Sequence, residues 1–289
     1  MSTSAVHSSL QLDERRLGML ELMGVAYRWP ATSTPSASPP EVVSPAAPTA
    51  VAVAAPVASH LPPTPLPKVT VTAPRPTPTF EAHPRPEVAT LGWEELESAV
   101  QSCRACGLCT HRRQAVLGMG PRRAKWMIVG EGPGEQEDKQ GLPFVGPAGQ
   151  LLDAMLAAMG LSRDTDVYIT NAVKCRPPSN RNPEPQEWMQ CQPYLMRQIE
   201  LVQPDLILSL GRYASHTLLD HTMPEAAKLP LGRLRGHVHQ WHQIPVIVSY
   251  HPAYLLRNPT EKAKVWQDLC SAMSQINHNP LSNLVKKDI

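Results

Sequence analysis

Short apolar runs and helical patterns alternate along residues 91–289 of the chain. Continuous apolar runs that end at Gly, Asn or a polar residue are typical of buried strands, and apolar residues spaced three and four apart predict helices. The predicted strands are 126–129, 167–172, 206–210 and 245–250. The predicted helices are 93–102, 147–160, 185–202, 213–219 and 260–276. Strands that alternate with helices predict an α/β fold, with three αβα layers around a central, mostly parallel sheet.

Residues 1–90 do not continue this pattern. Of the 32 prolines, 16 lie between Pro30 and Pro86, in a segment rich in Ala, Val, Thr and Ser without helical or strand period. This composition predicts a disordered, partly polyproline-like linker over 30–90. Before the linker, the apolar side of 10–29 predicts a short helix, which is unstable alone in water. This helix either packs on the folded domain or binds another protein, and its position at the end of a long disordered linker favours binding. The predicted organisation is a partner-binding segment (1–29), a linker (30–90) and a folded domain (91–289).

The overall composition excludes few functions. The net charge of +2 creates no global field that would indicate a nucleic-acid partner, although local basic clusters remain. The N-terminus has no charged and then apolar signal segment, and the chain has no run of about 18 apolar residues. We therefore expect a cytoplasmic protein that does not contact a membrane.

The six cysteines are not expected to form disulfides, because a domain of this size folds without them. Four of them can form one thiolate set, in which a distant pair closes onto a local pair two residues apart. These are Cys103, Cys106, Cys175 and Cys191. Zinc and a [4Fe-4S] cluster both accept four thiolates, and four buried free cysteines are a third possibility. Cys109 is close enough to compete as a ligand, and Cys270 is interpreted as part of the core.

Polar side chains follow three of the predicted strands. The first strand ends at the acidic, Gly-rich stretch Gly130–Asp138, the second at Asn171 and the last at His251. Because the carboxyl ends of parallel strands meet at one edge of a sheet, Glu131, Asn171 and His251 are expected along one rim, where open α/β sheets bind ligands. The alternative for the acidic stretch is an ordinary connection with a solvated tip.

Five features in order resemble family 4 uracil-DNA glycosylases across nearly all of residues 91–276. They are Gly130–Asp138, Gly141–Gly146, Thr170–Pro178, His251–Arg257 and the four-cysteine pattern. The resemblance implies an enzyme of base excision repair that flips uracil out of DNA, hydrolyses its N-glycosidic bond and leaves an abasic site. It also implies a [4Fe-4S] cluster on the four cysteines. We accordingly expect uracil-containing DNA as the partner of a monomeric, nucleoid-associated bacterial protein.

Three residues are expected to contact the flipped base. An aromatic ring can stack on a pyrimidine, and the resemblance gives this role to Phe144. The amide of Asn171 can accept from uracil N3-H and donate to O4, where cytosine presents a donor instead. His251 is the expected donor to uracil O2, because negative charge develops on the base as the bond breaks. The ordinary alternatives are a core Phe, a turn-capping Asn and a solvated His.

The residues that activate water are less clearly indicated. Backbone N-H groups near Gly132 are expected to help stabilise the uracil anion, and the resemblance places Glu131 and Glu137 around the base and the attacking water. Glu137 or Asp138 is the candidate base, unless orienting the water is sufficient for a reactive sugar cation.

Two further groups are expected to contact DNA. Tyr254, Leu255 and Leu256 are candidates for a wedge that fills the space left by the flipped base. Five arginines after predicted strands are candidates for phosphate contacts, with solvated arginines as the alternative. They are Arg176, Arg181, Arg233, Arg235 and Arg257.

The N-terminal stretch Arg15–Val25, with Trp29 after it, resembles the segment of the replicase psi subunit that docks onto the chi subunit of the clamp-loader complex. This resemblance implies that residues 10–29 bind chi and tether the enzyme to the replisome. The alternative function is a psi-like subunit whose glycosylase-like core is accessory or inactive.

Overall fold

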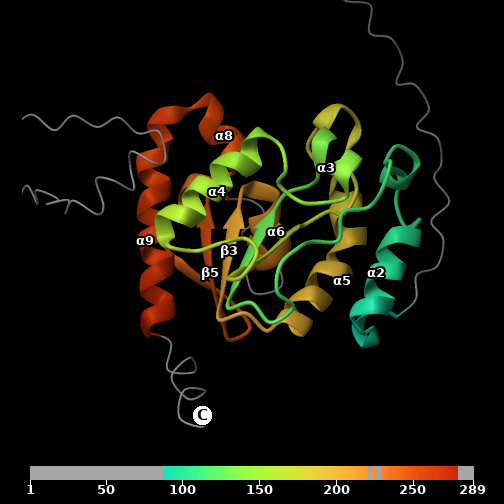
Figure 1. Ribbon diagram of the computed structural model, residues 1–289, viewed down its shortest axis with the longest axis horizontal. Coiled ribbons are helices and arrows are strands. Elements are labelled where there is room, and N and C mark those ends of the chain that lie inside the picture. Colours follow the sequence, from blue (N-terminus) through green and yellow to red (C-terminus); the bar gives the residue numbers. More distant parts are fainter. Residues whose placement is uncertain (1–86, 221–222, 226–228, 279–289) are drawn as a thin grey trace, which may run out of the picture. The chain divides into compact units, whose positions relative to one another are not determined.

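The computed structural model describes residues 87–220, 223–225 and 229–278 of the chain. The predicted partner-binding helix at 10–29 and nearly all of the predicted linker lie outside these residues. The described residues form an αβα sandwich around one five-stranded sheet (Figure 1). Within them, no helix is both long enough and apolar enough to cross a membrane.

The sheet has the strand order β2-β1-β3-β5-β4. Its strands are β1 (Trp126–Gly130), β2 (Val167–Asn171), β3 (Leu206–Leu210), β4 (Val238–Trp241) and β5 (Ile244–Ser249). The four strands predicted from the sequence are parallel neighbours, which confirms the mostly parallel sheet. They are apolar and almost wholly buried, as expected for strands covered on both faces.

Strand β4 was not predicted from the sequence. It pairs antiparallel with β5 at the edge of the sheet, and three of its four residues are exposed or partly exposed. Its sequence, Val-His-Gln-Trp, contains no apolar run that would predict a strand. β4 is a strand because it forms hydrogen bonds with β5.

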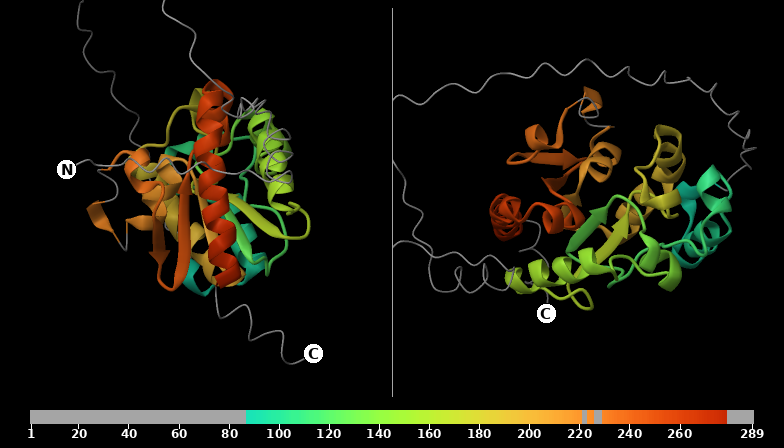
Figure 2. Two further views of the ribbon diagram at one scale, coloured as in Figure 1. Left: turned by 90° about the vertical axis from the view of Figure 1, so that its left-hand side faces the viewer. Right: turned by 90° about the horizontal axis from the view of Figure 1, so that it is seen from above.

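Helices cover both faces of the sheet and one end of it (Figures 1 and 2). The α-helices are α2 (Trp93–Ser102), α3 (Glu135–Gln140), α4 (Pro147–Met159), α5 (Pro185–Val202), α6 (Arg212–Leu219), α7 (Leu231–Leu234), α8 (Pro252–Arg257) and α9 (Lys262–His278). The 3-10 turns are η1 (Val88–Thr90), η2 (Gly107–Thr110), η3 (Pro178–Asn180) and η5 (Pro259–Glu261). Of these helices, α3, α7 and α8 were not predicted, because each has only four to six residues and shows no full helical repeat.

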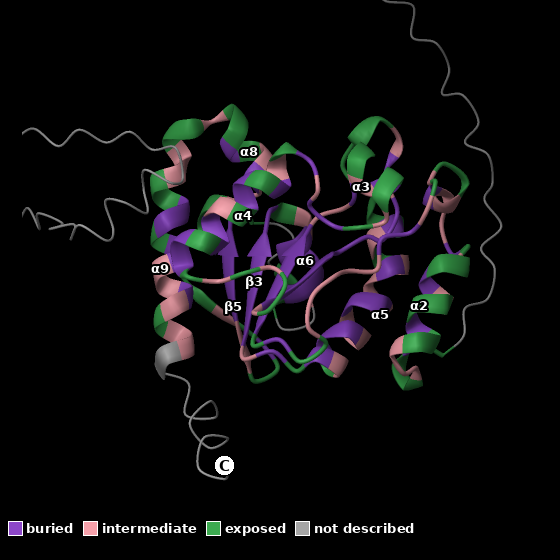
Figure 3. Ribbon diagram, viewed as in Figure 1, coloured by how far each residue is buried: buried purple, intermediate pink, exposed green. Residues whose placement is uncertain are grey.

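The core is divided by the sheet, whose parallel strands are buried on both sides (Figure 3). On one face, side chains of α4, α8 and α9 pack together, and on the other face those of α5, α6 and α7 do so. A third cluster joins α2 to the outer side of α5 and includes Cys175 and Cys191. The side chains within the parallel strands are therefore used for packing. Side chains that can contact a ligand lie at the carboxyl ends of these strands.

Candidate active site and cysteine site

A cavity of about 630 Å³ lies where the parallel strands end, which is a volume typical of ligand-binding sites. Six of the residues predicted to contact the base or the water line it. They are Glu131, Gly132, Glu137, Phe144, Asn171 and His251. The structure thus brings the three strand-end residues to one rim and adds to them the loop between α3 and α4 that carries Phe144.

Asn171 is the last residue of β2 and pairs with Gly130 of β1. Its side chain is only 2 % exposed, and among the described residues its Oδ1 atom is buried without a hydrogen-bond partner. Its backbone carbonyl accepts a 2.7 Å hydrogen bond from Nζ of the buried Lys174. A buried acceptor without a partner costs about 1–3 kcal/mol, so this amide oxygen is placed for a ligand that donates to it.

Phe144 lies against Asn171 and His251. A Cβ atom at Gly130 would collide with Asn171 Oδ1 and with the Phe144 ring, so only glycine lets both approach the end of β1. The rings of Phe144 and His251 face each other, with centroids 5.4 Å apart and planes inclined by 25°. Phe144 itself has a left-handed backbone, with φ of 53°. A phenylalanine pays a steric penalty in that conformation, so contacts of the surrounding structure have to maintain it.

His251 is the N-cap of α8, and its Nδ1 atom accepts a 3.2 Å hydrogen bond from the backbone N-H of Ala253. The neutral ring therefore carries its proton on Nε2, which is free to donate. The pKa of His251 is lowered to about 4, mainly by burial and also by the charge of Arg257, while Glu137 opposes the shift. The site consequently presents a neutral imidazole donor at physiological pH.

Glu131 directly follows β1, and its carboxylate lies at the N-terminus of α6. One of its carboxylate oxygens accepts a 3.1 Å hydrogen bond from the backbone N-H of Tyr213. Burial raises the pKa of Glu131 above its ordinary value, while the N-H groups of Arg212 and Tyr213 oppose this shift. Helix N-termini stabilise negative charge, which explains how a largely buried carboxylate is held at the cavity wall.

Glu137 is engaged with backbone groups through both of its oxygens. Oε2 accepts from the N-H of Gly134 at 3.1 Å, and Oε1 accepts from the N-H groups of Val145 and Gly146 at 2.9 and 3.0 Å. Asp138, the other candidate base, is buried, accepts from the N-H of Arg113 at 2.9 Å and does not line the cavity. The structure therefore removes Asp138 from the water-activating candidates.

The predicted wedge needs correction at its middle residue. Leu255 is 0 % exposed and packs in the core with side chains of α4 and α9, because Pro252 and Leu255, three residues apart, form the buried side of α8. Tyr254 and Leu256, on the outer side of α8, are 36 % and 47 % exposed. Of the three, only these two can reach DNA.

The predicted phosphate contacts also need correction. The Arg235 side chain is only 9 % exposed and donates to the buried carboxylate of Asp268 at 2.8 Å, so it is a structural residue. Arg181 lines the cavity but is committed to two hydrogen bonds with Glu187, at 2.6 and 2.8 Å. Arg257 lines the cavity and remains a candidate for a phosphate contact.

The four predicted cysteine ligands lie together at a second, small cavity between α2 and α5. Arg112 Nη1 donates to Cys175 Sγ at 2.8 Å, and the backbone N-H of Lys174 donates to Cys191 Sγ at 3.2 Å. Cys109 also lines this cavity, while Cys270 packs against the core on α9 as predicted. All six cysteines of the chain lie among the described residues, and none of them forms a disulfide.

Hydrogen bonds from N-H groups to sulfur are those that cluster-bound thiolates accept, so the donor set has the chemistry of an iron–sulfur site. Within the described ranges, no group of three or more His, Cys, Asp or Glu side chains is placed to hold a metal ion. The sulfurs of a zinc site all lie about 2.3 Å from one ion, whereas each thiolate of a [4Fe-4S] cluster binds its own iron and the set is wider. The four cysteines around one cavity, with N-H donors to two of their sulfurs, are the donor set that such a cluster requires.

The sequence interpretation missed several residues that shape the site. Tyr213 and Arg212 contribute N-H groups to Glu131, and Arg163 donates to the backbone of the Phe144 loop. A strand that ends at Gly211 before a helix is a signal for the first two, because such turns point helix N-H groups at the ligand edge. Arg163 has no comparable signal, since its partners are backbone carbonyls distant in sequence.

Comparison with known proteins agrees with this geometry. The family model for the uracil DNA glycosylase superfamily matches residues 117–270. The type-4 uracil-DNA glycosylase of Saccharolobus solfataricus is 40% identical over 192 residues, which cover 65% of this chain and 88% of that protein. The type-4 uracil-DNA glycosylase of Thermotoga maritima is 42% identical over 186 residues, which cover 63% of this chain and 94% of that protein. The chain therefore belongs to the type-4 family of uracil-DNA glycosylases, within the uracil DNA glycosylase superfamily.

Proposed function

We propose that this protein removes uracil from DNA by hydrolysing the N-glycosidic bond and leaving an abasic site, as a monofunctional glycosylase of DNA repair. The observation that carries the proposal is the buried, unpartnered Oδ1 of Asn171 in a cavity that also presents a neutral histidine and an aromatic ring. Family membership supports the same reaction. A flipped uracil would enter the cavity edge-on to Asn171 and flat against Phe144.

Asn171 accounts for the choice of base. Its Oδ1 would accept from uracil N3-H, and its amide N-H would donate to O4. Cytosine has an acceptor at N3 and a donor in place of O4, so both contacts would become repulsive. The buried oxygen has no other partner among the described residues, so a base that cannot donate to it leaves its desolvation uncompensated.

Bond cleavage leaves the electron pair on uracil N1 and positive charge on the sugar. The Nε2-H of His251 would donate to O2, and the backbone N-H of Gly132 would add to the stabilisation of the anion. Water then bonds to C1′ and loses a proton, and the released base gains one at N1. A neutral histidine serves this role without having to lose a proton first, which agrees with its lowered pKa.

Glu131 is the proposed water-orienting carboxylate. It lines the cavity. Its Oε1 atom accepts from the N-H of Tyr213, and its other oxygen does not bond to that group. Glu137, whose oxygens accept from three backbone N-H groups, is proposed to act on the base and the water through the loop that it holds.

We also propose that Cys103, Cys106, Cys175 and Cys191 hold a [4Fe-4S] cluster. The cluster would supply covalent cross-linking of α2, the loop after β2 and α5. Cys175 follows Asn171 by four residues, and Pro177 of the same loop lines the large cavity. The cysteine site would therefore fix one wall of the uracil site.

The test of the proposed function is incubation of anaerobically purified protein with single- and double-stranded oligonucleotides that contain one uracil. Strand scission after alkali should mark abasic sites in both, and Asn171→Ala and His251→Ala should lose most of this activity. Gln192→Ala is a matched control, because Gln192 bonds to the backbone of α6, outside the cavity. Protein with an intact cluster that releases no uracil from either substrate would refute the proposal.

The second candidate function concerns residues 10–29, which lie outside the described residues and outside the matched region 117–270. Their proposed binding to the chi subunit, and with it the tether to the replisome, rests on their sequence alone. A pull-down with the full-length chain and with a chain lacking residues 1–29 tests it, and equal recovery of chi with both would contradict it. A psi-like subunit with an inactive core would bind chi and release no uracil.

A further inference from the structure

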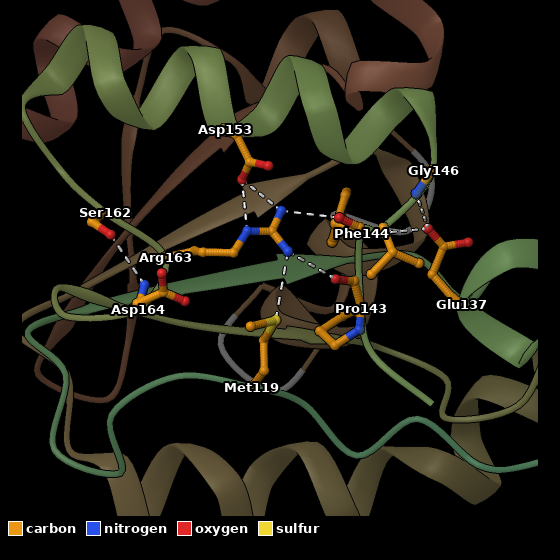
Figure 4. A network of polar contacts seen from close by, with 10 residues as sticks. Met119, Glu137, Pro143, Phe144, Gly146, Asp153, Ser162, Arg163 and Asp164 are labelled. Carbon is orange, nitrogen blue, oxygen red and sulfur yellow. Dashed lines mark hydrogen bonds and ion pairs between the residues drawn. The ribbon is translucent and has the colours of Figure 1, made fainter. Parts of the chain in front are cut away.

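The backbone of Phe144 is held by an arginine that lies outside the cavity. Arg163, in the turn between α4 and β2, donates through Nη2 to the Phe144 carbonyl at 2.9 Å and through Nη1 to the Pro143 carbonyl at 3.4 Å. Its Nε donates to Asp153 of α4 at 2.7 Å, and Nη2 lies 2.6 Å from the same carboxylate. Figure 4 shows the guanidinium between Asp153 and the two carbonyls.

The turn that carries Arg163 is itself fixed. The N-H of Ser162 donates to Asp166 Oδ2 at 2.8 Å, and the N-H of Asp164 donates to the Ser162 hydroxyl at 3.3 Å. The Arg163 side chain is 16 % exposed, so it reaches the Phe144 loop through the protein and not through solvent. A planar, permanently charged donor set with a carboxylate behind it loses little freedom when it binds carbonyls.

Two other contacts hold the same loop from different sides. Glu137 accepts from the N-H groups of Val145 and Gly146, as Figure 4 also shows. On α4, a Cβ atom at Gly149 would collide with the carbonyl of Phe144, so the helix packs directly on this peptide. The carbonyl of Phe144 and the N-H groups of the next two residues, Val145 and Gly146, are thus all hydrogen-bonded.

These contacts matter because Phe144 has a strained backbone. With φ of 53°, a non-glycine residue returns to a more favourable conformation unless its neighbours prevent it. Such a rotation would change the direction of the Cα–Cβ bond and take the ring away from His251, which it faces at 5.4 Å. Displacement of a substrate-contacting group by about 1 Å can reduce a rate roughly 100-fold.

We propose that Arg163 is a positioning residue for uracil release: by binding the Phe144 carbonyl, it maintains the left-handed backbone that presents the Phe144 ring to the flipped base. This inference rests on the proposed function, in which the ring stacks on uracil. Arg163 does not line the cavity and contacts no reacting atom. Asp153 assists it by orienting the guanidinium.

The experiment compares full-length, cluster-loaded wild type with Arg163→Met, Phe144→Ala and the double variant. The single-turnover rate at saturating enzyme and the concentration of free uracil that halves this rate are both measured. Arg163→Met should lower the rate about 10-fold and raise the half-inhibitory uracil concentration, because the ring is no longer held for stacking. In the Phe144→Ala background, Arg163→Met should change either quantity by less than about twofold.

Arg197→Met is the matched control. Arg197 also donates to a backbone carbonyl, that of Leu91 at 2.7 Å, and to a carboxylate, that of Glu200 at 3.0 Å, but neither lines the cavity. It should leave the rate and the uracil inhibition unchanged. Arg163→Lys, which keeps the charge and one donor direction, should recover part of the loss.

The outcomes separate the inference from the proposed function. If wild type releases no uracil, the proposed function fails. The positioning role is overturned if wild type and the Arg197 control are active and Arg163→Met has the same rate. It is also overturned if Arg163→Met lowers the rate by the same factor in the Phe144→Ala background. If Arg163→Met does not fold, Asp153→Asn replaces it in the same double-variant comparison with Phe144→Ala. The Asp153 carboxylate is half exposed, and this variant keeps the arginine but removes the charge that orients it.

Discussion

The protonation of His251 gives a quantitative prediction for the pH dependence of uracil release. With its pKa lowered to about 4, the imidazole is about 97 % neutral at pH 5.5. A histidine with an ordinary pKa of about 6.5 would be only about 10 % neutral there. The two cases differ about tenfold in the amount of neutral donor, which is a difference that rates resolve easily.

We therefore expect the single-turnover rate to stay within about twofold from pH 8 to pH 5.5 and to change only as the pH approaches 4. Rates would be measured on a uracil-containing single-stranded oligonucleotide at saturating enzyme, with cluster absorption recorded at each pH. His237→Asn, which removes an exposed histidine beside β4, serves as the control. A rate transition with an apparent pKa between 6 and 7, also present in this control, would refute the claim that His251 acts as a neutral donor.

The same shift affects stability. Because the pKa of His251 is lower in the folded chain, the unfolded chain binds more protons between about pH 4 and 6.5. The contribution of His251 to the free energy of unfolding is complete above about pH 6.5 and is lost as the pH falls through about 4. The shift corresponds to at most about 3.5 kcal/mol, since one pKa unit is about 1.4 kcal/mol. Urea unfolding of wild type and His251→Asn should converge in free energy as the pH is lowered across this window.

Three further predictions follow from the contacts described. Asn171→Ala should reduce kcat/KM for uracil release about 10- to 100-fold, as expected for loss of a buried hydrogen-bonding partner, and an equal rate for the variant would exclude base recognition by this amide. Cys191→Ser should abolish the visible absorption of the cluster, while Cys109→Ser retains it; the reverse result in anaerobic spectra would exchange the two ligands. Arg235→Met should lower the free energy of unfolding by about 3–5 kcal/mol in urea, because it leaves the buried Asp268 without its ion-pair partner, and a change below about 1 kcal/mol would contradict this account.

The sequence alone was sufficient to predict the parallel strands and the rim. β1, β2, β3 and β5 are apolar runs long enough to be buried on both faces, so local pattern and tertiary environment agree. The strand-end residues Glu131, Asn171 and His251 could be predicted as neighbours because parallel connections bring all carboxyl ends to one edge. The iron–sulfur interpretation, in contrast, depended on family resemblance, since cysteine spacing accepts zinc equally well.

Only the tertiary structure decided what each of these groups can do. It assigned Leu255 to the core, paired Arg235 with Asp268, placed the proton of the neutral His251 on Nε2 and left the Asn171 oxygen without a partner. It also brought Arg163 to the Phe144 carbonyl. The physical reason is that these properties depend on burial and on hydrogen bonds to backbone groups far along the chain, and backbone carbonyls are the same in every sequence. Periodicity records which side of an element is apolar, but the partner of a polar group is determined only when the chain is packed.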